Sequence, residues 1–206
     1  MTRRKSLIKT PYRRRRAFRD ERESFIIICE GENTEPIYFR SFRLSSASIK
    51  TISYTNKGNA LNFVRAAVGF KESCLESYDN YWVVFDKDNT TENDFNQAIS
   101  LAIRNGYKVA YSIQAFEFWF ILHYSYHEGP MPRDSYKERL GRYLGYEYDK
   151  SKATCHKLYD SLKPLQETAI RNAVAVLRAI GDHSNIGSEE SSTTVHCLVK
   201  ELNKYI

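Results

Sequence analysis

The sequence has no hydrophobic run long enough to cross a membrane and few residues of the kinds that hold small secreted proteins together. No apolar segment approaches the roughly 20 residues that a transmembrane helix needs. The four cysteines are far apart and form no CxxC pair, which argues against a zinc knuckle and against a disulfide framework. The amino terminus is basic but lacks the apolar region of a signal peptide. We therefore expect a cytoplasmic protein with reduced thiols and no membrane contact.

Positive charge is concentrated at the amino terminus. Residues 1–22 hold ten Lys or Arg and two acidic residues, whereas the whole chain carries +6, so the remaining 184 residues carry −2. We expect this segment to be a flexible basic arm. Its consecutive arginines Arg13, Arg14, Arg15 and Arg16 are suited to nucleic-acid phosphates. The same charge is equally consistent with a solvated tail or with docking on an acidic partner surface.

Apolar, strand-like segments alternate with amphipathic, helix-like segments over residues 23–127. Each predicted strand is followed by a predicted helix; the strands are 24–29, 49–54, 81–85 and 107–113, and the helix after the fourth strand is expected over 115–124. The helix after the second strand is expected to carry Leu61, Val64, Val68 and Leu75 along one side. In the third unit, Thr91 and Asp94 have the spacing of a capping box. Four strand–helix repeats predict an α/β fold with a mostly parallel four-stranded sheet flanked by helices.

The pattern changes at a Gly/Pro-rich break, EGPMPRD, at residues 128–134. Residues 128–206 are predicted to form a mainly helical C-terminal extension packed on the α/β core. Its expected helices are 135–143, 151–163, 164–180 and 191–206.

Acidic residues stand at the carboxyl ends of two predicted strands. Glu30 directly follows the first strand, and Asp86 and Asp88 end the third. Because the carboxyl ends of parallel strands meet at one edge of a sheet, we expect these carboxylates to share a rim. Crowded carboxylates repel one another unless a cation neutralises them, and oxygen ligands favour Mg²⁺ or Mn²⁺ over zinc. The alternative for each residue is ordinary turn or helix-capping chemistry.

Two further charged residues are open to two interpretations each. Glu35 can complete the acidic cluster, or it can act as a first-turn carboxylate that interacts with the helix dipole. Lys57, in the turn after the second predicted strand, can meet a phosphate at the rim or remain solvated.

Several segments of the chain resemble, in the same order, the motifs of the RloB-like family. They are ICEGENTEPIYF, VVFDKDN, YSIQAFEFWFILHY, the helical stretch that begins YDKSKATCHKLY, and the terminal SSTTVHCLVKEL. The resemblance runs from about residue 24 to the last residue and leaves out the basic arm. A Glu-Gly after one strand followed about 55 residues later by a strand-terminal DxD also resembles the acidic signature of Toprim domains.

The resemblance implies a Toprim-like core and roles for four carboxylates. Glu30 matches a metal ligand or general base, and Asp86 and Asp88 match the metal ligands of the DxD motif. Glu117 matches the glutamate of a Phe-Glu motif at the start of the helix after the fourth strand. The family more usually has Asn-Pro before this motif, whereas Gln114-Ala115 stands here.

The activity that the resemblance implies is metal-dependent hydrolysis of phosphodiester bonds in DNA or RNA. Family members are associated with bacterial antiphage and abortive-infection systems, often beside an ATPase, so we expect an AAA- or ABC-type ATPase partner. One rival is a catalytically silent Toprim-like module that binds nucleic acid or a nucleotide and regulates that ATPase. Another is a primase-like nucleotidyl transferase, which the lack of a separate template-handling or zinc domain in 206 residues disfavours.

Overall fold

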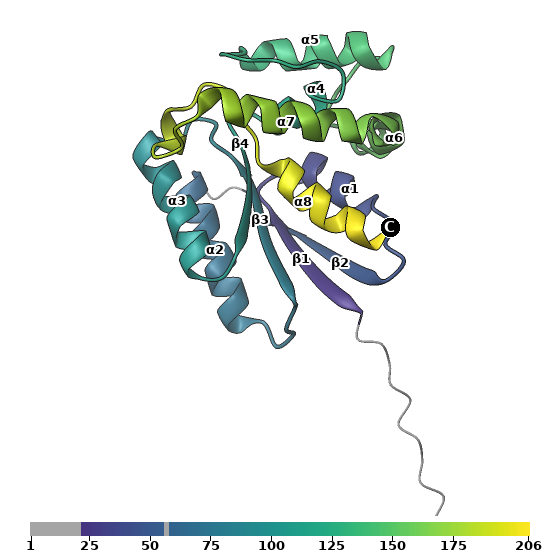
Figure 1. The fold of residues 1–206 in the computed structure, drawn as a ribbon. Helices are drawn as coiled ribbons and strands as arrows, with labels where there is room; N and C mark the ends of the chain where they lie inside the picture. The colour runs from purple at the N-terminus through teal and green to yellow at the C-terminus, as the bar shows by residue number, and fades with distance from the viewer. Residues whose placement is uncertain (1–21, 56–57) are drawn as a thin grey trace, which may run out of the picture.

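A four-stranded parallel sheet forms the centre of the computed structural model, which describes residues 22–55 and 58–206 (Figure 1). The strands lie in the order β2-β1-β3-β4, and all neighbouring pairs are parallel. Their bounds are β1 Glu23–Cys29, β2 Ala47–Ser53, β3 Asn80–Asp86 and β4 Lys108–Ser112. The prediction of an α/β fold with a parallel four-stranded sheet and flanking helices is therefore confirmed.

Strand β1 shows why an unbroken apolar sequence suits a central strand. Successive side chains of a strand point to opposite faces. Phe25, Ile27 and Cys29 enter the hydrophobic cluster on one face, and Ile26 and Ile28 enter the cluster on the other. Because helices cover both faces of this part of the strand, every position from Phe25 to Cys29 is apolar.

Helices α2 (Ala60–Ser73) and α3 (Glu92–Arg104) cover one face of the sheet (Figure 1). The Thr91 side chain accepts a hydrogen bond from the Asp94 amide at 3.2 Å, so the predicted helix start is confirmed. The Asn59 side chain starts α2 in the same way, accepting from the Asn62 amide at 2.9 Å. The prediction that Leu75 packs along α2 is wrong, because the helix ends at Ser73 and Leu75 is fully exposed.

The other face and the carboxyl end of the sheet are covered by helices from both halves of the chain. Helix α1 (Thr34–Arg40) and the C-terminal helix α8 (Val195–Leu202) lie over the sheet (Figure 1). The remaining helices are α4 Glu117–Ile121, α5 Arg133–Leu144, α6 Lys152–Leu162, α7 Gln166–Ile180 and the 3₁₀ turns η1 Lys163–Leu165, η2 Ile186–Ser188 and η3 Asn203–Tyr205. No helix in the described part of the chain has the length and apolar character needed to span a bilayer.

Two predicted helices are shorter than their sequences indicate. The segment 115–124 holds only the five-residue α4, followed by tight turns. The helix predicted to begin at residue 191 begins at Val195 instead. Residues before it pair with the edge strand β4: Ser112 bridges Thr193 in antiparallel fashion, and Ile113 donates to the Ser192 carbonyl at 2.9 Å. The C-terminal segment therefore covers a sheet edge that would otherwise be open.

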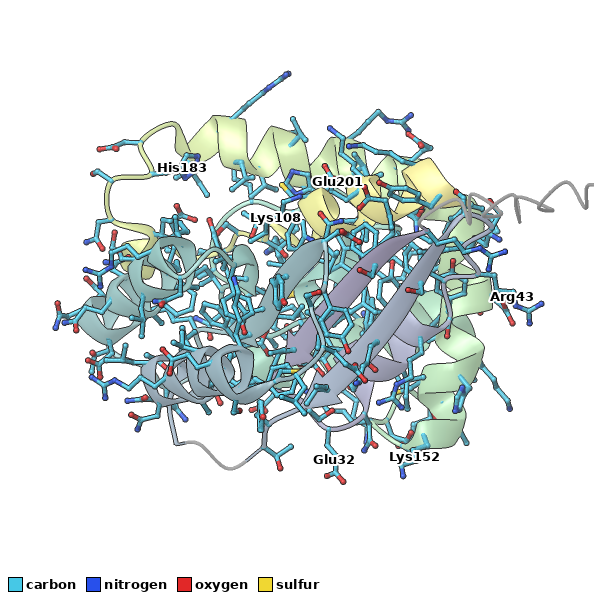
Figure 2. The ribbon with its side chains drawn as sticks, turned by 90° about the horizontal axis from the view of Figure 1, so that it is seen from below. Glu32, Arg43, Lys108, Lys152, His183 and Glu201 are labelled. Carbon is cyan, nitrogen blue, oxygen red and sulfur yellow. The ribbon has the colours of Figure 1, made fainter. Side chains whose placement is uncertain are left out.

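The strand order defines where a ligand site is expected. The chain passes from β1 to β2 on one side and then crosses to β3 on the other, so the order reverses between β1 and β3. Parallel α/β sheets bind ligands in the crevice beyond the carboxyl ends at such a switch point. Glu30 follows β1 and Asp86 ends β3, so both border this crevice. In Figure 2, Glu32 marks this end of the sheet and Lys108 marks the opposite end.

Candidate functional site

Glu30 and Asp86 meet at the switch point. The Glu30 amide donates to the Val84 carbonyl at 2.9 Å, which continues the β1–β3 ladder by one bond. The Glu30 carboxylate reaches across the two strands, and its Oε2 accepts a hydrogen bond from the Asp86 amide at 3.3 Å. A glutamate at the end of β1 is therefore held over the end of β3.

A pocket of about 320 Å³ opens at this edge of the sheet and collects most of the charged candidates. We call it the acidic pocket. Its charged lining residues are Glu30, Glu32, Glu35, Asp86, Asp88 and Lys150. Asp88 is exposed and has a positive φ of 41°, a conformation that Asp tolerates better than most side chains. The structure therefore brings all three strand-end carboxylates to one pocket.

Glu35 is part of this pocket, and Gly31 makes room for it. The Glu35 side chain is buried, with 7% of the residue exposed. A Cβ atom on residue 31 would lie 1.9 Å from Glu35 Oε2, closer than any real contact. The glycine after Glu30 thus allows a second carboxylate to approach the backbone of the β1–α1 turn. Glu35 therefore fits both interpretations: it lines the acidic pocket, and as a first-turn carboxylate it interacts with its own backbone amide.

The carboxylates of this cluster are held in an environment that disfavours their charge. Burial, with repulsion from Glu35 and Glu117, raises the pKa of Asp86 well above its ordinary value, and Lys150 only partly opposes this. Burial, with repulsion from Glu117, likewise raises the pKa of Glu35 to about 7, although its own backbone amide opposes the rise. Burial also raises the pKa of Glu30, against the stabilising Asp86 amide. A bound cation would offset the repulsion between these carboxylates and favour their charged forms.

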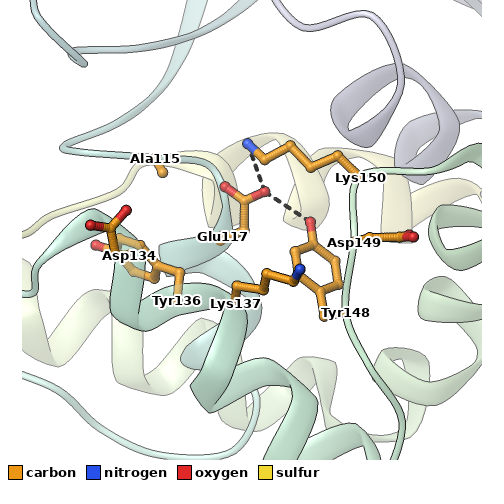
Figure 3. A pocket seen from close by; sticks show the side chains of 8 residues that line it. All are labelled: Ala115, Glu117, Asp134, Tyr136, Lys137, Tyr148, Asp149 and Lys150. Atoms are coloured by element: carbon orange, nitrogen blue, oxygen red, sulfur yellow. Dashed lines mark hydrogen bonds and ion pairs between the residues drawn. The ribbon is translucent and has the colours of Figure 1, made fainter.

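Glu117 lies beside the cluster in an ion pair that sequence analysis did not find. Its Oε1 accepts a hydrogen bond from the Tyr148 hydroxyl at 2.8 Å and pairs with Lys150 Nζ at 2.9 Å (Figure 3). Glu117 is buried, whereas more than half of the Lys150 side chain is exposed. Burial lowers the pKa of Lys150, but Glu117, Asp86 and Glu35 outweigh this and raise it, so the ammonium stays charged.

Lys150 also separates the acidic pocket from a neighbouring one. The second pocket, of about 470 Å³, is lined by Glu117 and Lys150 together with Ala115, Asp134, Tyr136, Lys137, Tyr148 and Asp149 (Figure 3). We call it the side pocket. Lys150 lines both pockets, so the Glu117–Lys150 pair stands at their boundary. No sequence signal distinguished Lys150 from the other lysines of its charged segment.

The turn before α4 holds Gln114-Ala115 where the resembling family usually has Asn-Pro. Gln114 has a positive φ of 73°, in the left-handed region where Asn is favoured over most other residues. An Asn at this position, as the resembling family usually has, would adopt this conformation more readily than Gln. The turn nevertheless leads into α4 with Glu117 as the first residue and its carboxylate directed at Lys150.

The donor chemistry of the acidic pocket fits a hard divalent cation. Within residues 22–55 and 58–206, no three Asp, Glu, His or Cys side chains converge closely enough to hold a metal ion as they stand. The negatively charged donors are all carboxylate oxygens, and the buried Asp86 Oδ1 has no hydrogen-bond partner. A buried acceptor without a partner is costly. Asp88 lines the same pocket and is more exposed than Asp86.

Five predicted nucleic-acid contacts lie outside the described residues. They are Lys57 and the arginines Arg13, Arg14, Arg15 and Arg16.

The family model described as RloB-like protein matches residues 25–202 of the chain. The match begins in β1 and ends with α8, so it includes the whole sheet, the acidic pocket and the C-terminal helices. No curated protein and no solved structure matches the chain.

Proposed function

The chain belongs to the RloB-like family, and from this premise we propose that it is a divalent-metal-dependent nuclease with its active site in the acidic pocket. The proposal places it in a bacterial antiphage defence of the abortive-infection type, beside an ATPase partner of the AAA or ABC class. Mg²⁺ or Mn²⁺ would be the cofactor and DNA or RNA the substrate. The Toprim-like signature of Glu30 and the Asp86-Lys87-Asp88 motif supports this assignment.

One observation supports the proposal most strongly. Asp86 ends a buried strand with an unpartnered Oδ1, next to Glu35 and within the electrostatic reach of Glu30 and Glu117. Concentrating negative charge at a buried point is unfavourable for stability alone. It is useful where a cation and a phosphodiester must be held together.

The roles of the chain's own residues follow from their positions. Asp86 and Asp88 would hold the ion together with Glu30, whose Oε2 is oriented by the Asp86 amide. Bound by these residues, the ion would supply Lewis acidity for a phosphoryl oxygen and for a water. Glu35 adds negative charge behind Asp86 and stays in place because residue 31 lacks a side chain.

Glu117 and Lys150 would act at the phosphate. Glu117 is fixed by Tyr148 and holds the Lys150 ammonium at the boundary of the two pockets. From there Lys150 can contact a substrate oxygen and stabilise charge that develops on the phosphoryl group. The side pocket adjoins the acidic pocket at Lys150 and would leave room for the part of the substrate next to the cleaved bond.

Cleavage by the purified full chain tests the proposal. Labelled single-stranded RNA, tRNA, single-stranded DNA and duplex DNA are incubated with Mg²⁺, with Mn²⁺ or with EDTA, using the chain alone and the chain purified with its co-expressed ATPase. We expect cleavage of at least one substrate that needs the divalent ion and that Glu30→Gln and Asp86→Asn abolish. Cleavage that persists in both variants, or no divalent-dependent cleavage of any substrate, would overturn the nuclease assignment.

The rival regulator predicts a different result. A module that only binds the ATPase should keep that partner when Asp86 is neutralised and should show no divalent-dependent cleavage. Co-purification of the ATPase with Asp86→Asn, scored beside the cleavage assay, therefore separates the two functions. Incorporation of labelled nucleotides into a growing strand would instead identify a primase-like transferase.

A further inference from the structure

A third pocket, separate from the acidic pocket, lies where α1 and α6 end. Helices α1 and α6 pack against each other, and both run away from the acidic pocket. The pocket measures about 410 Å³. The lining side chains that carry its chemistry are Arg40, Arg43, His156, Tyr159, Asp160 and Lys163. We call it the α1–α6 pocket.

The charge of the α1–α6 pocket is positive. Three permanent cations, Arg40, Arg43 and Lys163, face one carboxylate, Asp160. All four side chains are exposed. In the described part of the chain none of the three cations forms an ion pair, whereas Lys50, Lys137, Arg142, Lys150 and Lys204 each do. Unpaired cations gathered in a concave site favour an anion with several oxygens.

The pocket lies close to the acidic pocket along the same two helices. Glu35 and Arg40 are both on α1, five residues apart, which is about 7.5 Å along a helix axis. Lys150 lines the acidic pocket just before α6 begins, and Lys163 follows the end of α6. In Figure 2, Lys152 marks the acidic-pocket end of α6, and Arg43 projects outward from the edge of the molecule.

The cations of the α1–α6 pocket can offset the repulsion between a nucleic acid and the acidic pocket. A polyanionic strand that crosses the acidic pocket is repelled by its carboxylates, and the chain beyond the basic arm carries a net charge of −2. Nonspecific affinity for nucleic acid comes mainly from cations that contact phosphates. The α1–α6 pocket supplies such cations on the folded body, within the length of a short helix from the carboxylates.

We infer that the α1–α6 pocket binds a backbone phosphate of the nucleic-acid strand whose neighbouring phosphodiester lies in the acidic pocket. This inference rests on the proposed function, since it assumes that a nucleic acid is the substrate. Arg43 and Lys163 contact the phosphate directly. The Arg40 Nε already donates to the Thr51 hydroxyl, so Arg40 has fewer donors left for a phosphate than Arg43 has.

The test measures binding without cleavage. Fluorescence anisotropy of labelled single-stranded RNA and DNA is followed in EDTA over a range of salt concentrations, with the full chain and the double variant Arg43→Gln/Lys163→Gln. The matched control is Arg104→Gln/Lys200→Gln, which removes the same charge from exposed positions on α3 and α8. Thermal melting shows that each variant is folded.

We expect the pocket variant to bind about tenfold more weakly and to lose about 0.7 from the slope of log affinity against log salt, because one neutralised phosphate on a single strand contributes about 0.7. The control should keep the wild-type slope. A loss of affinity and of slope with either RNA or DNA supports the inference. The nucleic acid that the wild type binds more tightly shows whether the site prefers ribose or deoxyribose. An unchanged slope in the pocket variant, or an equal loss in the control, overturns it.

The result is separable from that of the nuclease assay. If the pocket variant loses binding while the wild type shows no divalent-dependent cleavage, phosphate binding by the α1–α6 pocket is supported and the nuclease assignment is wrong. If Asp86→Asn abolishes cleavage while the pocket variant binds and cleaves like the wild type, the nuclease assignment stands and this pocket has another role. A pocket that recognised an acidic protein surface would give that second outcome.

Discussion

Two aspartates bracket β3 and differ in almost every physical respect. Asp79 precedes the strand at its amino end, and its Oδ2 accepts hydrogen bonds from the Ser24 amide at 2.8 Å and the Ser24 hydroxyl at 2.6 Å. These bonds lower its pKa. Asp86 ends the same strand, has an unpartnered Oδ1, and has a pKa that burial and its carboxylate neighbours raise. The amino end of the sheet is built for stability, and the carboxyl end is built at the expense of stability.

The contrast extends to the residues around each aspartate. At the amino end, Asn80 bridges the strands by donating to Glu23 and accepting from Lys108. At the carboxyl end lie the two described non-glycine residues with positive φ, Asp88 and Gln114. Strained backbone and unfavourable charge are typical of functional sites, and both lie at the end of the sheet where we propose the active site. The difference between Asp79 and Asp86 can therefore be tested residue for residue.

The largest effect is expected on catalysis. Asp86→Asn should lower kcat/KM for divalent-dependent cleavage by more than about 100-fold, because it removes a proposed metal ligand and the negative charge. Asp79→Asn makes the same chemical change at the other end of β3 and should leave cleavage unaltered. Equal activity of the two variants in a cleavage time course would contradict the prediction that the two ends of β3 differ in function.

Stability should respond in the opposite direction. Because the folded state holds the Asp86 proton to a higher pH than the unfolded state does, stability falls as pH rises from about 3.9, the unfolded pKa, through the raised value. Asp86→Asn should therefore raise the free energy of unfolding of the metal-free protein by about 1–2 kcal/mol at about pH 8. The gain should shrink as the pH is lowered. Urea unfolding in EDTA at several pH values measures this, and a loss of stability on substitution would contradict it.

A smaller effect is expected from the glycine that accommodates Glu35. Gly31→Ala should push the Glu35 carboxylate aside and lower cleavage about tenfold, since the contact involves a movable side-chain end and the fold can adjust. The matched control is Gly69→Ala on α2, where an added Cβ meets nothing within 4 Å. That control should keep full activity and gain about 0.5–1 kcal/mol of stability. Wild-type activity of Gly31→Ala would show that the position of Glu35 does not matter.

The smallest effect is expected at the amino end. Asp79→Asn weakens the charge-assisted bonds from Ser24, and because the site is exposed we expect a loss of only about 0.5–1 kcal/mol at neutral pH. A lowered folded pKa contributes stability above the unfolded pKa that is lost as the pH falls through the folded pKa, so the loss should vanish in acid. Unfolding curves that show the loss growing in acid would contradict the assigned role of Asp79.

The sheet and the strand-end carboxylates could be predicted from sequence because their signals are local. The apolar run of β1, the capping pair Thr91 and Asp94, and Glu30 directly after a strand are each read from adjacent residues. Strand order was not available from these patterns. It places β1 beside β3, and therefore Glu30 beside Asp86, through contacts between residues 56 positions apart.

The remaining parts of the site depend on such distant contacts. Lys150 pairs with Glu117 across 33 residues of chain, and nothing in the composition of its segment marks it. The apolar sequence around α4 predicted a longer helix, because periodicity cannot show that the chain must turn to direct Glu117 toward Lys150. Arg40, Arg43 and Lys163 likewise form a pocket only because α1 packs on α6.

The central claim is that the carboxylates at the switch point form a divalent-cation site, and calorimetric titration with Mn²⁺ tests it most directly. The full chain, Asp86→Asn and Asp79→Asn are titrated at neutral pH after their folded state has been verified by thermal melting. We predict that the wild type and Asp79→Asn bind the ion with the same affinity and that Asp86→Asn does not bind it. Equal binding by all three proteins, or no binding by the wild type even with an oligonucleotide present, would contradict the claim.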